Sequence, residues 1–274
     1  MKTLQFVGFI LFSSVLSVAQ SKEEEIVFNY AVDLLANEKY QDAADCFAKF
    51  LADFPDSPLK GRAHFNLALS FKGLGDLTRA KAEFVEILDM PYNERDENSL
   101  MEPYTLYKHH TCRMLAAIAL NEQDYQEAER YITMFDKKFP YQHFCGNEWA
   151  AYDMFKAVML ARVYAATNRS QKALETLAPY TFSNGLASNH QVLEELETIV
   201  RREFTKAEIK AELIHALESL QVKQRKGETI ATVKLLNVSV EVEDYSEPSD
   251  PNEPPTEHYK RIVTSNQLFK KYIE

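Results

Sequence analysis

The chain has 274 residues, of which 46% are hydrophobic, and a formal net charge of -10 at pH 7. A chain of this length buries a sizeable core without cross-links, so its three cysteines, an odd number, are not expected to form a disulfide framework. The acidic balance argues against nucleic acid and anionic membrane as general partners, because both carry negative charge.

Residues 1–19 have the features of a bacterial signal peptide. Lys2 supplies a positive start, an apolar run extends from Leu4 to Val18, and Ser17-Val18-Ala19 offers small residues for cleavage. The run is too short and too rich in serine for a comfortable transmembrane helix, which needs about 20 mostly apolar residues. We therefore predict an exported mature protein, periplasmic or secreted, with no transmembrane span; an uncleaved anchor is the alternative.

Paired segments with a helical period follow. Residues 26–37, 64–74 and 111–121 each read as a first helix, because their apolar residues recur every three or four positions. Each is followed by a second helical segment with one spacing of landmarks and a closing proline, which ends a helix. The landmarks are Tyr40, Ala43, Phe47 and Pro55, then Leu77, Ala80, Phe84 and Pro91, then Tyr125, Ala128, Ile132 and Pro140. The repeating unit is therefore a helix pair of about 34 residues.

Apolar residues also recur at fixed places in the first helices of these pairs, which start at Glu24, Gly61 and His109. They are Tyr30, Ala31 and Leu34, then Leu67, Ala68 and Phe71, then Leu115, Ala116 and Ala119. The pattern resembles the tetratricopeptide repeat (TPR). A weaker fourth copy starts at Met154 and has Ser170 where the family usually has an aromatic residue. The resemblance covers residues 24–187 and implies a mostly α fold, an α-solenoid of helix hairpins. Because the copies are unequally spaced, the extra residues are expected in loops or in lengthened helices.

Two more helices are predicted after the repeats, within residues 190–224. They cover residues 190–204 and 206–224, with Thr205 as the N-cap of the second and Glu208 completing a capping box. A solenoid needs a terminal unit that covers its open apolar end. We assign that role to these two helices.

The C-terminal segment, residues 228–274, differs in kind. Apolar and polar residues alternate from Thr229 to Glu243, which is typical of a half-buried strand. The alternation slips between Leu235 and Leu236, where a bulge or a turn is expected.

A lone strand cannot satisfy its own backbone donors and acceptors. The partner expected within this chain is a strand at Tyr259–Thr264, reached across an acidic, proline-rich loop at residues 245–257. Ser265 would then cap a short final helix that ends near Tyr272. Two interpretations stay open: a hairpin folded against the last helices, or a docking element that adds to the sheet of another protein.

The resemblance also implies a binding surface. In the TPR family the first helix of each pair lines a concave groove, and the matching candidates for peptide binding are Phe28, Asn29, Arg62, Phe65, Asn66, Lys72, His110, Arg113 and Arg162. Aromatic rings supply anchoring area and guanidinium groups hold carboxylates, so we expect an acidic or C-terminal peptide there. Glu25 and Phe28 stand where the family's carboxylate clamp has lysine and asparagine. The alternative is that these residues are ordinary solvated charges and core-edge aromatics.

No pattern of nucleophile and base stands out, so the chain is not predicted to be an enzyme. The groupings His109, His110 and Cys112, and His143 and Cys145, fall short of the four ligands of a closed metal site, and neither a metal nor a cofactor is expected. The predicted function is a non-enzymatic exported scaffold or adaptor that binds a peptide or envelope protein, with no prediction of oligomeric state. The alternative is a ligand-recognition domain, for carbohydrate or peptidoglycan, that serves an exported enzyme system.

Overall fold

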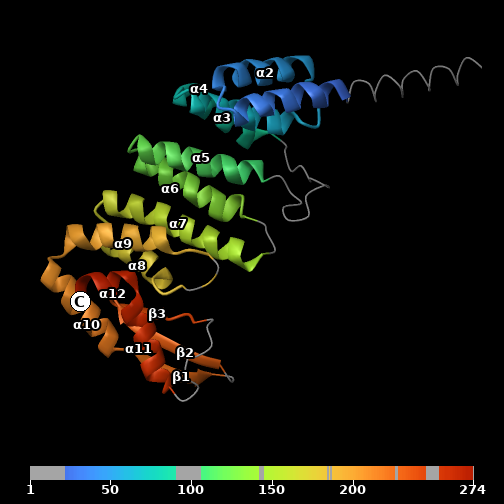
Figure 1. The fold of residues 1–274 in the computed structure, drawn as a ribbon. Helices are drawn as coiled ribbons and strands as arrows, with labels where there is room; N and C mark the ends of the chain where they lie inside the picture. Colours follow the sequence, from blue (N-terminus) through green and yellow to red (C-terminus); the bar gives the residue numbers. More distant parts are fainter. Residues whose placement is uncertain are drawn as a thin grey trace, which may run out of the picture. The chain divides into compact units, whose positions relative to one another are not determined.

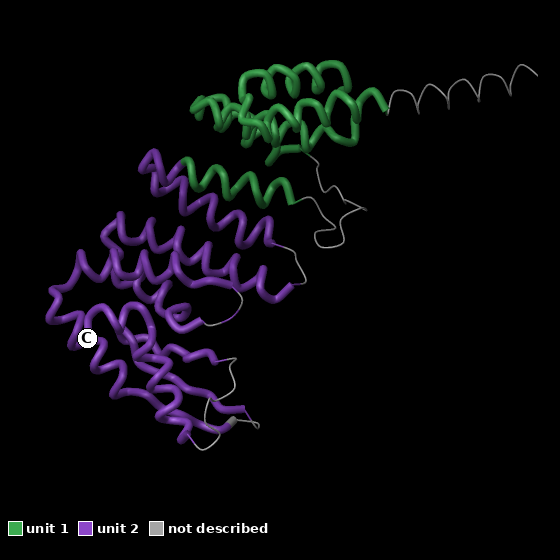
Figure 2. The backbone as a smooth tube through the Cα atoms, viewed as in Figure 1, with its two compact units in different colours: residues 1–97, 104–118 green, residues 98–103, 119–274 purple. Residues whose placement is uncertain are grey.

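A computed structural model describes residues 22–90, 106–141, 145–183, 185, 187–225, 228–244 and 253–273. The signal peptide predicted at residues 1–19 lies outside these ranges, as do Pro91 and His143. The described chain is mostly helical, with a small antiparallel sheet near its C-terminus (Figure 1), as the sequence predicts. It divides into two compact units, residues 1–97 with 104–118 (unit 1) and residues 98–103 with 119–274 (unit 2) (Figure 2).

Unit 1 is built from helices alone in the ranges that the structure describes. They are a helix over residues 22–36, then α2 (Tyr40–Asp53), α3 (Lys60–Gly73), α4 (Leu77–Asp89) and most of α5 (Tyr107–Asn121). Helix α3 packs against both α2 and α4, and the predicted landmarks Phe47 and Phe84 are fully buried. Tyr30, which the repeat pattern places at a packing position, is instead 59% exposed, because the buried stripe of its helix runs through Phe28, Ala31 and Leu34 and Tyr30 lies beside it.

Four turns between consecutive helices share one backbone conformation. The residues with a left-handed φ are Glu38 (58°), Gly75 (77°), Gln123 (61°) and Asn168 (57°). The N–H of the next residue then donates to an earlier carbonyl, in the pairs Lys39 to Leu34, Asp76 to Phe71, Asp124 to Ala119 and Arg169 to Tyr164, at 2.8–2.9 Å. This hydrogen bond and the left-handed residue define the Schellman motif that ends many helices. The four turns are therefore local repeats of one another, although the segments between the copies differ in length.

The helices of unit 2 lie at the predicted places except that α7 begins at Gly146, well before the predicted start of the fourth copy at Met154. They are α6 (Tyr125–Thr133), which runs into a π-helical turn (Met134–Lys138), α7 (Gly146–Ala166), α8 (Ser170–Leu177), a 3-10 turn (Ala178–Tyr180), α9 (His190–Glu203) and α10 (Lys206–Glu218). The Thr205 side chain accepts from the Glu208 N–H and the Glu208 carboxylate accepts from the Thr205 N–H, which confirms the capping box.

The sheet pairs within the chain. Its strands β1 (Gln221–Arg225), β2 (Glu228–Leu235) and β3 (Val238–Glu241) are antiparallel, in the order β1-β2-β3. The predicted slip at Leu236 is a hairpin turn, in which Leu236 and Asn237 both have positive φ (50° and 65°), as a two-residue hairpin turn requires. Since β2 is the central strand, both of its edges are already used, by β1 and by β3.

Four predictions for the tail are wrong: the end of the helix at residues 206–224, the strand at Tyr259–Thr264, the end of the loop at residues 245–257 and the cap at Ser265. The helix predicted at residues 206–224 ends at Glu218. Residues Gln221–Arg225, although rich in helix-forming residues, pair with β2 and form a strand instead. Tyr259–Thr264 is not a strand but part of α11 (Pro255–Ser265). This helix begins inside the predicted loop, and its first residue, Pro255, occupies a position that proline favours in helices. The short final helix, α12 (Gln267–Ile273), is confirmed.

Polar contacts join this tail to the rest of unit 2. Strand β2 packs on α10, and α12 packs on α9 and α10. Asn266, rather than the predicted Ser265, caps α12, since its Oδ1 accepts from the Leu268 N–H at 2.9 Å, while its Nδ2 donates to the Thr181 carbonyl at 2.9 Å. Glu197 of α9 accepts from Lys271 and from the Tyr272 hydroxyl of α12.

Among the described residues, no helix combines the length and the apolar character needed to cross a bilayer.

Candidate functional site

The structure brings together three of the predicted binding residues on one surface of unit 1. Arg62 and Phe65 are three positions apart on α3, and Tyr107 and His110 are three apart on α5, so each pair shares a helix face. The Arg62 Nε donates to the Tyr107 hydroxyl at 2.9 Å. The Phe65 ring centroid lies 5.9 Å from that of Tyr107 and 6.4 Å from that of His110. We call Arg62, Phe65, Tyr107 and His110 the Phe65 cluster.

The Phe65 cluster combines a held cation with aromatic area. Tyr107 is buried, whereas Arg62, Phe65 and His110 are half-buried. The Phe65 ring packs edge-on against the Phe84 ring, with their centroids 5.7 Å apart. A guanidinium held by a neighbouring hydroxyl loses less conformational freedom when it binds a ligand. The arrangement suits a group that offers both a carboxylate and apolar surface.

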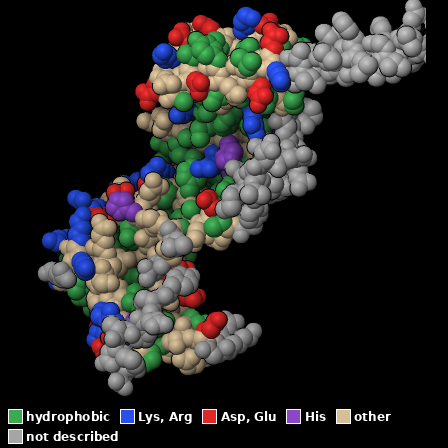
Figure 3. Space-filling view, turned by 45° about the vertical axis from the view of Figure 1, so that its right-hand side comes forward, with side chains coloured by type: hydrophobic (Ala, Val, Ile, Leu, Met, Phe, Trp, Pro, Cys, Tyr) green, Lys and Arg blue, Asp and Glu red, His purple; other side chains and the backbone are tan. Residues whose placement is uncertain are grey.

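The other predicted residues of unit 1 lie in different settings. Asn29 and Lys72 are exposed, and Asn66 and Arg113 are half-buried. Phe28 is only 6% exposed and packs edge-on against Phe47 and Phe50, with ring centroids 5.8 and 5.6 Å away, which leaves little of its ring for a ligand. On the face of unit 1 that Figure 3 presents, acidic and basic side chains are interspersed among hydrophobic ones.

Arg162 belongs to unit 2 and already has a carboxylate partner there. Its Nε donates to Glu195 of α9 at 2.7 Å. The Arg162 side chain is 55% exposed, whereas that of Glu195 is 14% exposed. The ion pair therefore ties α7 to α9, and a ligand carboxylate would compete with Glu195 for this guanidinium.

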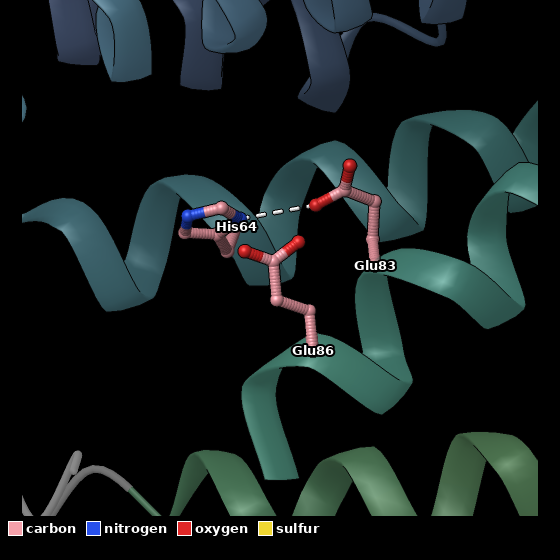
Figure 4. A group of neighbouring side chains, drawn as sticks. All are labelled: His64, Glu83 and Glu86. Atoms are coloured by element: carbon pink, nitrogen blue, oxygen red, sulfur yellow. Dashed lines mark hydrogen bonds and ion pairs between the residues drawn. The ribbon is translucent and has the colours of Figure 1, made fainter. Parts of the chain in front are cut away.

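A metal-capable group that the sequence reasoning missed lies in the second helix pair. Nδ1 of His64 on α3 is 3.0 Å from Oε2 of Glu83 on α4, and Glu86 brings a second carboxylate toward them (Figure 4). The sequence does contain a signal for this contact. His64 and Glu86 lie equally far along the chain from the turn residue Gly75, and two antiparallel helices joined by a turn bring such positions together. In the ranges that the structure describes, no other group of three metal-ligating side chains was found this close.

The groupings that the sequence did suggest are placed differently. His109 and Cys112 are buried, at 1% and 0% exposure, and His110 belongs to the Phe65 cluster. Cys46, Cys112 and Cys145 all have free thiols.

An exposed aromatic side chain marks a second surface, on unit 2. Trp149, the only tryptophan in the sequence, is 40% exposed in the first turns of α7. Its ring meets that of Tyr141 edge-on at 5.9 Å, and Tyr141 in turn stacks on Tyr152 at 5.3 Å. The indole thus contacts one tyrosine ring, Tyr141, which is itself stacked on a second.

In comparisons with known proteins, no family model, no curated protein and no solved structure matches this chain.

Proposed function

We propose that this chain is a non-enzymatic, exported scaffold of TPR-like helix pairs that binds an acidic segment of a partner protein at the Phe65 cluster. The observation that carries the proposal is the convergence of Arg62, Phe65 and His110 from two helices onto one surface. Residues three apart on each helix supply both the charge and the rings. The export part of the proposal rests on the composition of residues 1–19.

The repeated turns support the scaffold interpretation. Four copies of one turn are consistent with the reuse of a single helix-pair design, and proteins built from stacked helix pairs use extended surfaces to bind other proteins. Each first helix then contributes side chains of its own to such a surface. The cluster lies on two of those first helices, α3 and α5.

Local charge, not net charge, supports an acidic partner. The chain as a whole carries a formal charge of -10, which repels an acidic peptide over most of the surface. Arg62, Lys72 and Arg113 lie on α3 and α5, so positive charge is available on the two helices that carry the Phe65 cluster. Repulsion elsewhere with local attraction favours specific over diffuse binding.

A charge-reversal experiment tests the proposal. The double variant Arg62→Glu/Arg113→Glu is compared with the charge-matched control Lys39→Glu/Lys49→Glu, whose residues are exposed on the same unit. The probe is a fluorescein-labelled peptide that carries four glutamates and one phenylalanine, measured by fluorescence anisotropy. We expect the first variant to lose at least about tenfold in affinity, the worth of one charge-assisted hydrogen bond, and the control to lose much less.

Equal losses in both variants would reduce the binding to general electrostatics and remove the Phe65 cluster from the proposal. Circular dichroism on each variant shows whether the helices persist. A pull-down from the envelope fraction with wild-type protein and the Arg62→Glu/Arg113→Glu variant extends the test to natural partners.

A second candidate function, carbohydrate recognition, is favoured by Trp149. An exposed indole that meets the Tyr141 ring edge-on offers a flat apolar surface of the kind that stacks on sugar rings. A glycan array probed with wild type and with Trp149→Ala distinguishes the two functions. A signal that Trp149→Ala abolishes and Arg62→Glu/Arg113→Glu leaves intact would favour this candidate over the scaffold.

A further inference from the structure

We infer that His64, Glu83 and Glu86 form a binding site for a divalent transition-metal ion, which joins α3 to α4 in unit 1. One donor atom from each side chain lies within 4.8 Å of the other two, and the three side chains point toward one another (Figure 4). Ligand bonds of about 2.0–2.2 Å place neighbouring donors of one ion roughly 3–3.5 Å apart. The His64–Glu83 separation of 3.0 Å already meets that spacing, and a small rotation of Glu86 completes it.

The charges of this group are explained better by an ion than by the protein alone. Glu83 and Glu86 are three residues apart on one helix, where like charges repel. Among the described residues, the ion pairs of unit 1 join no lysine or arginine to Glu86. A hydrogen bond between His64 and Glu83 is enough to hold α3 against α4, but it gives Glu86 no role. A divalent cation turns the second carboxylate from a repulsive neighbour into a ligand.

The donor set selects the kind of ion. Imidazole favours zinc, iron, nickel and copper, carboxylate tolerates zinc and manganese, and the group offers no thiolate for copper(I). Calcium and magnesium prefer oxygen ligands throughout. Three protein ligands leave at least one coordination position for water or for a group from a bound molecule. The His64 and Glu83 side chains are 11% and 21% exposed, while Glu86 is exposed, so the ion would enter from the Glu86 side.

Zinc binding to the full chain tests the site. Protein stripped with a chelator is titrated with zinc chloride by calorimetry, and cobalt(II) is used in parallel because its visible absorption reports coordination. We expect Glu86→Gln to weaken zinc binding at least about tenfold, a loss that even outer-shell changes can reach, and His64→Gln to weaken it further. The control is Asp89→Asn, which removes an exposed carboxylate from the same helix and should leave the affinity unchanged.

A stability measurement separates a bound ion from a structural hydrogen bond. At zinc concentrations about 100 times the Kd, we expect the Tm of the wild type to rise by roughly 5–10 °C, and Glu86→Gln to lose this rise while keeping the metal-free Tm. Glu86→Gln leaves the His64–Glu83 contact intact, so folding is not at stake. Zinc binding that is unchanged in both variants, or no binding to the wild type at 100 µM zinc, would overturn the inference. Neither result bears on the peptide binding proposed for the Phe65 cluster.

Discussion

His258 of α11 is nearly buried between two carboxylates. Its Nε2 contacts Asp244, which is 5% exposed, and its Nδ1 lies 3.1 Å from Glu253. The Arg261 guanidinium shares Glu253 and lies 3.0 Å from the same Nδ1. The hydrogen bond to Asp244 outweighs the effect of burial and, with that to Glu253, raises the His258 pKa above its ordinary value of 6.5.

We predict that this histidine makes the stability of unit 2 depend on pH. Because the His258 pKa is higher in the folded state, its contribution is complete below pH 6.5 and is lost as the pH rises through the folded pKa. The free energy of unfolding should therefore fall over this range by up to about 1.4 kcal/mol per pH unit. Urea unfolding between pH 6 and pH 9 measures it.

His258→Asn should flatten that slope and cost roughly 3 kcal/mol at pH 6, since it leaves the buried Asp244 without the imidazole. The matched control is His215→Asn, at an exposed histidine of α10. A slope that survives in His258→Asn would assign the pH dependence to other groups.

At the scale of single residues, the sequence predicts some of the candidate binding residues that the structure brings together and misses the candidate metal ligands. Arg62, Phe65 and His110 could be nominated because their positions within a repeat are fixed by counting along one helix. The group of His64 and Glu83 could not be found in that way, because its members meet across two helices. The repeating pattern shows which face of a helix a residue occupies, but the neighbouring helix decides what that residue touches.

The close approach of α3 to α2 depends on a single missing side chain. A Cβ added at Gly73 would overlap the ring of Tyr40, the first residue of α2. Two residues later, Gly75 carries the left-handed φ of 77° that the turn requires. The two glycines thus meet two different demands, close approach and backbone conformation.

We predict that both positions resist alanine, for separable reasons. Gly73→Ala should cost about 1–3 kcal/mol through overpacking, and that cost should vanish when Tyr40→Ala is introduced as well. Gly75→Ala should cost about 1 kcal/mol in either background, because the strain lies in the backbone. Chemical unfolding of the wild type, of Gly73→Ala, Gly75→Ala and Tyr40→Ala, and of the two double variants with Tyr40→Ala gives the coupling energies.

Gly146→Ala is the control, since a Cβ there meets nothing within 4 Å, and it should change stability little. If Gly73→Ala costs the same with and without the Tyr40 ring, the contact is not the cause.

Among the elements, the helices of the repeats were predictable and parts of the tail were not. Long segments with a 3.6-residue period, such as α2 and α4, match their predicted places. Short segments such as Tyr259–Thr264 fit both the strand period of two residues and the helical period of 3.6 residues. Tyr259 and Val263, for example, are one helical turn apart and both are buried. Gln221–Arg225 has no strand-forming signal of its own and becomes a strand only through β2.

For the molecule as a whole, the C-terminal tail belongs to the fold of unit 2. Val233 and Leu235 of β2 are buried, as are Leu268 and Phe269 of α12. The N–H of Lys234 donates to the Ser219 hydroxyl at 2.7 Å, so β2 is fastened to the end of α10. Of the two interpretations left open by the sequence, a strand that completes its pairing inside the chain is the one that the structure shows.

Deletion of residues from Glu228 onward should therefore destabilise unit 2. It uncovers apolar residues of α9 and α10, and a loss of about 5 kcal/mol lowers the Tm by roughly 10 °C or more. Differential scanning calorimetry measures the shift. Two substitutions in β2 test the same point without removing the tail. Val233→Asp, at a buried position, should lower the Tm in part, whereas Lys234→Asp, at the exposed neighbouring position, should not. A truncated protein that melts at the wild-type temperature would mean that the tail folds separately.

The constancy of the four turns, set against the variety of the segments between copies, indicates where this chain tolerates redesign. One residue inserted into the turn at Glu38 would break the hydrogen bond from the Lys39 N–H to the Leu34 carbonyl and change the direction in which α2 leaves the turn. An insertion between copies leaves the turn inside each pair intact. The junction at residues 54–59, between α2 and α3, is accordingly a better place for a short inserted segment than any of the four turns.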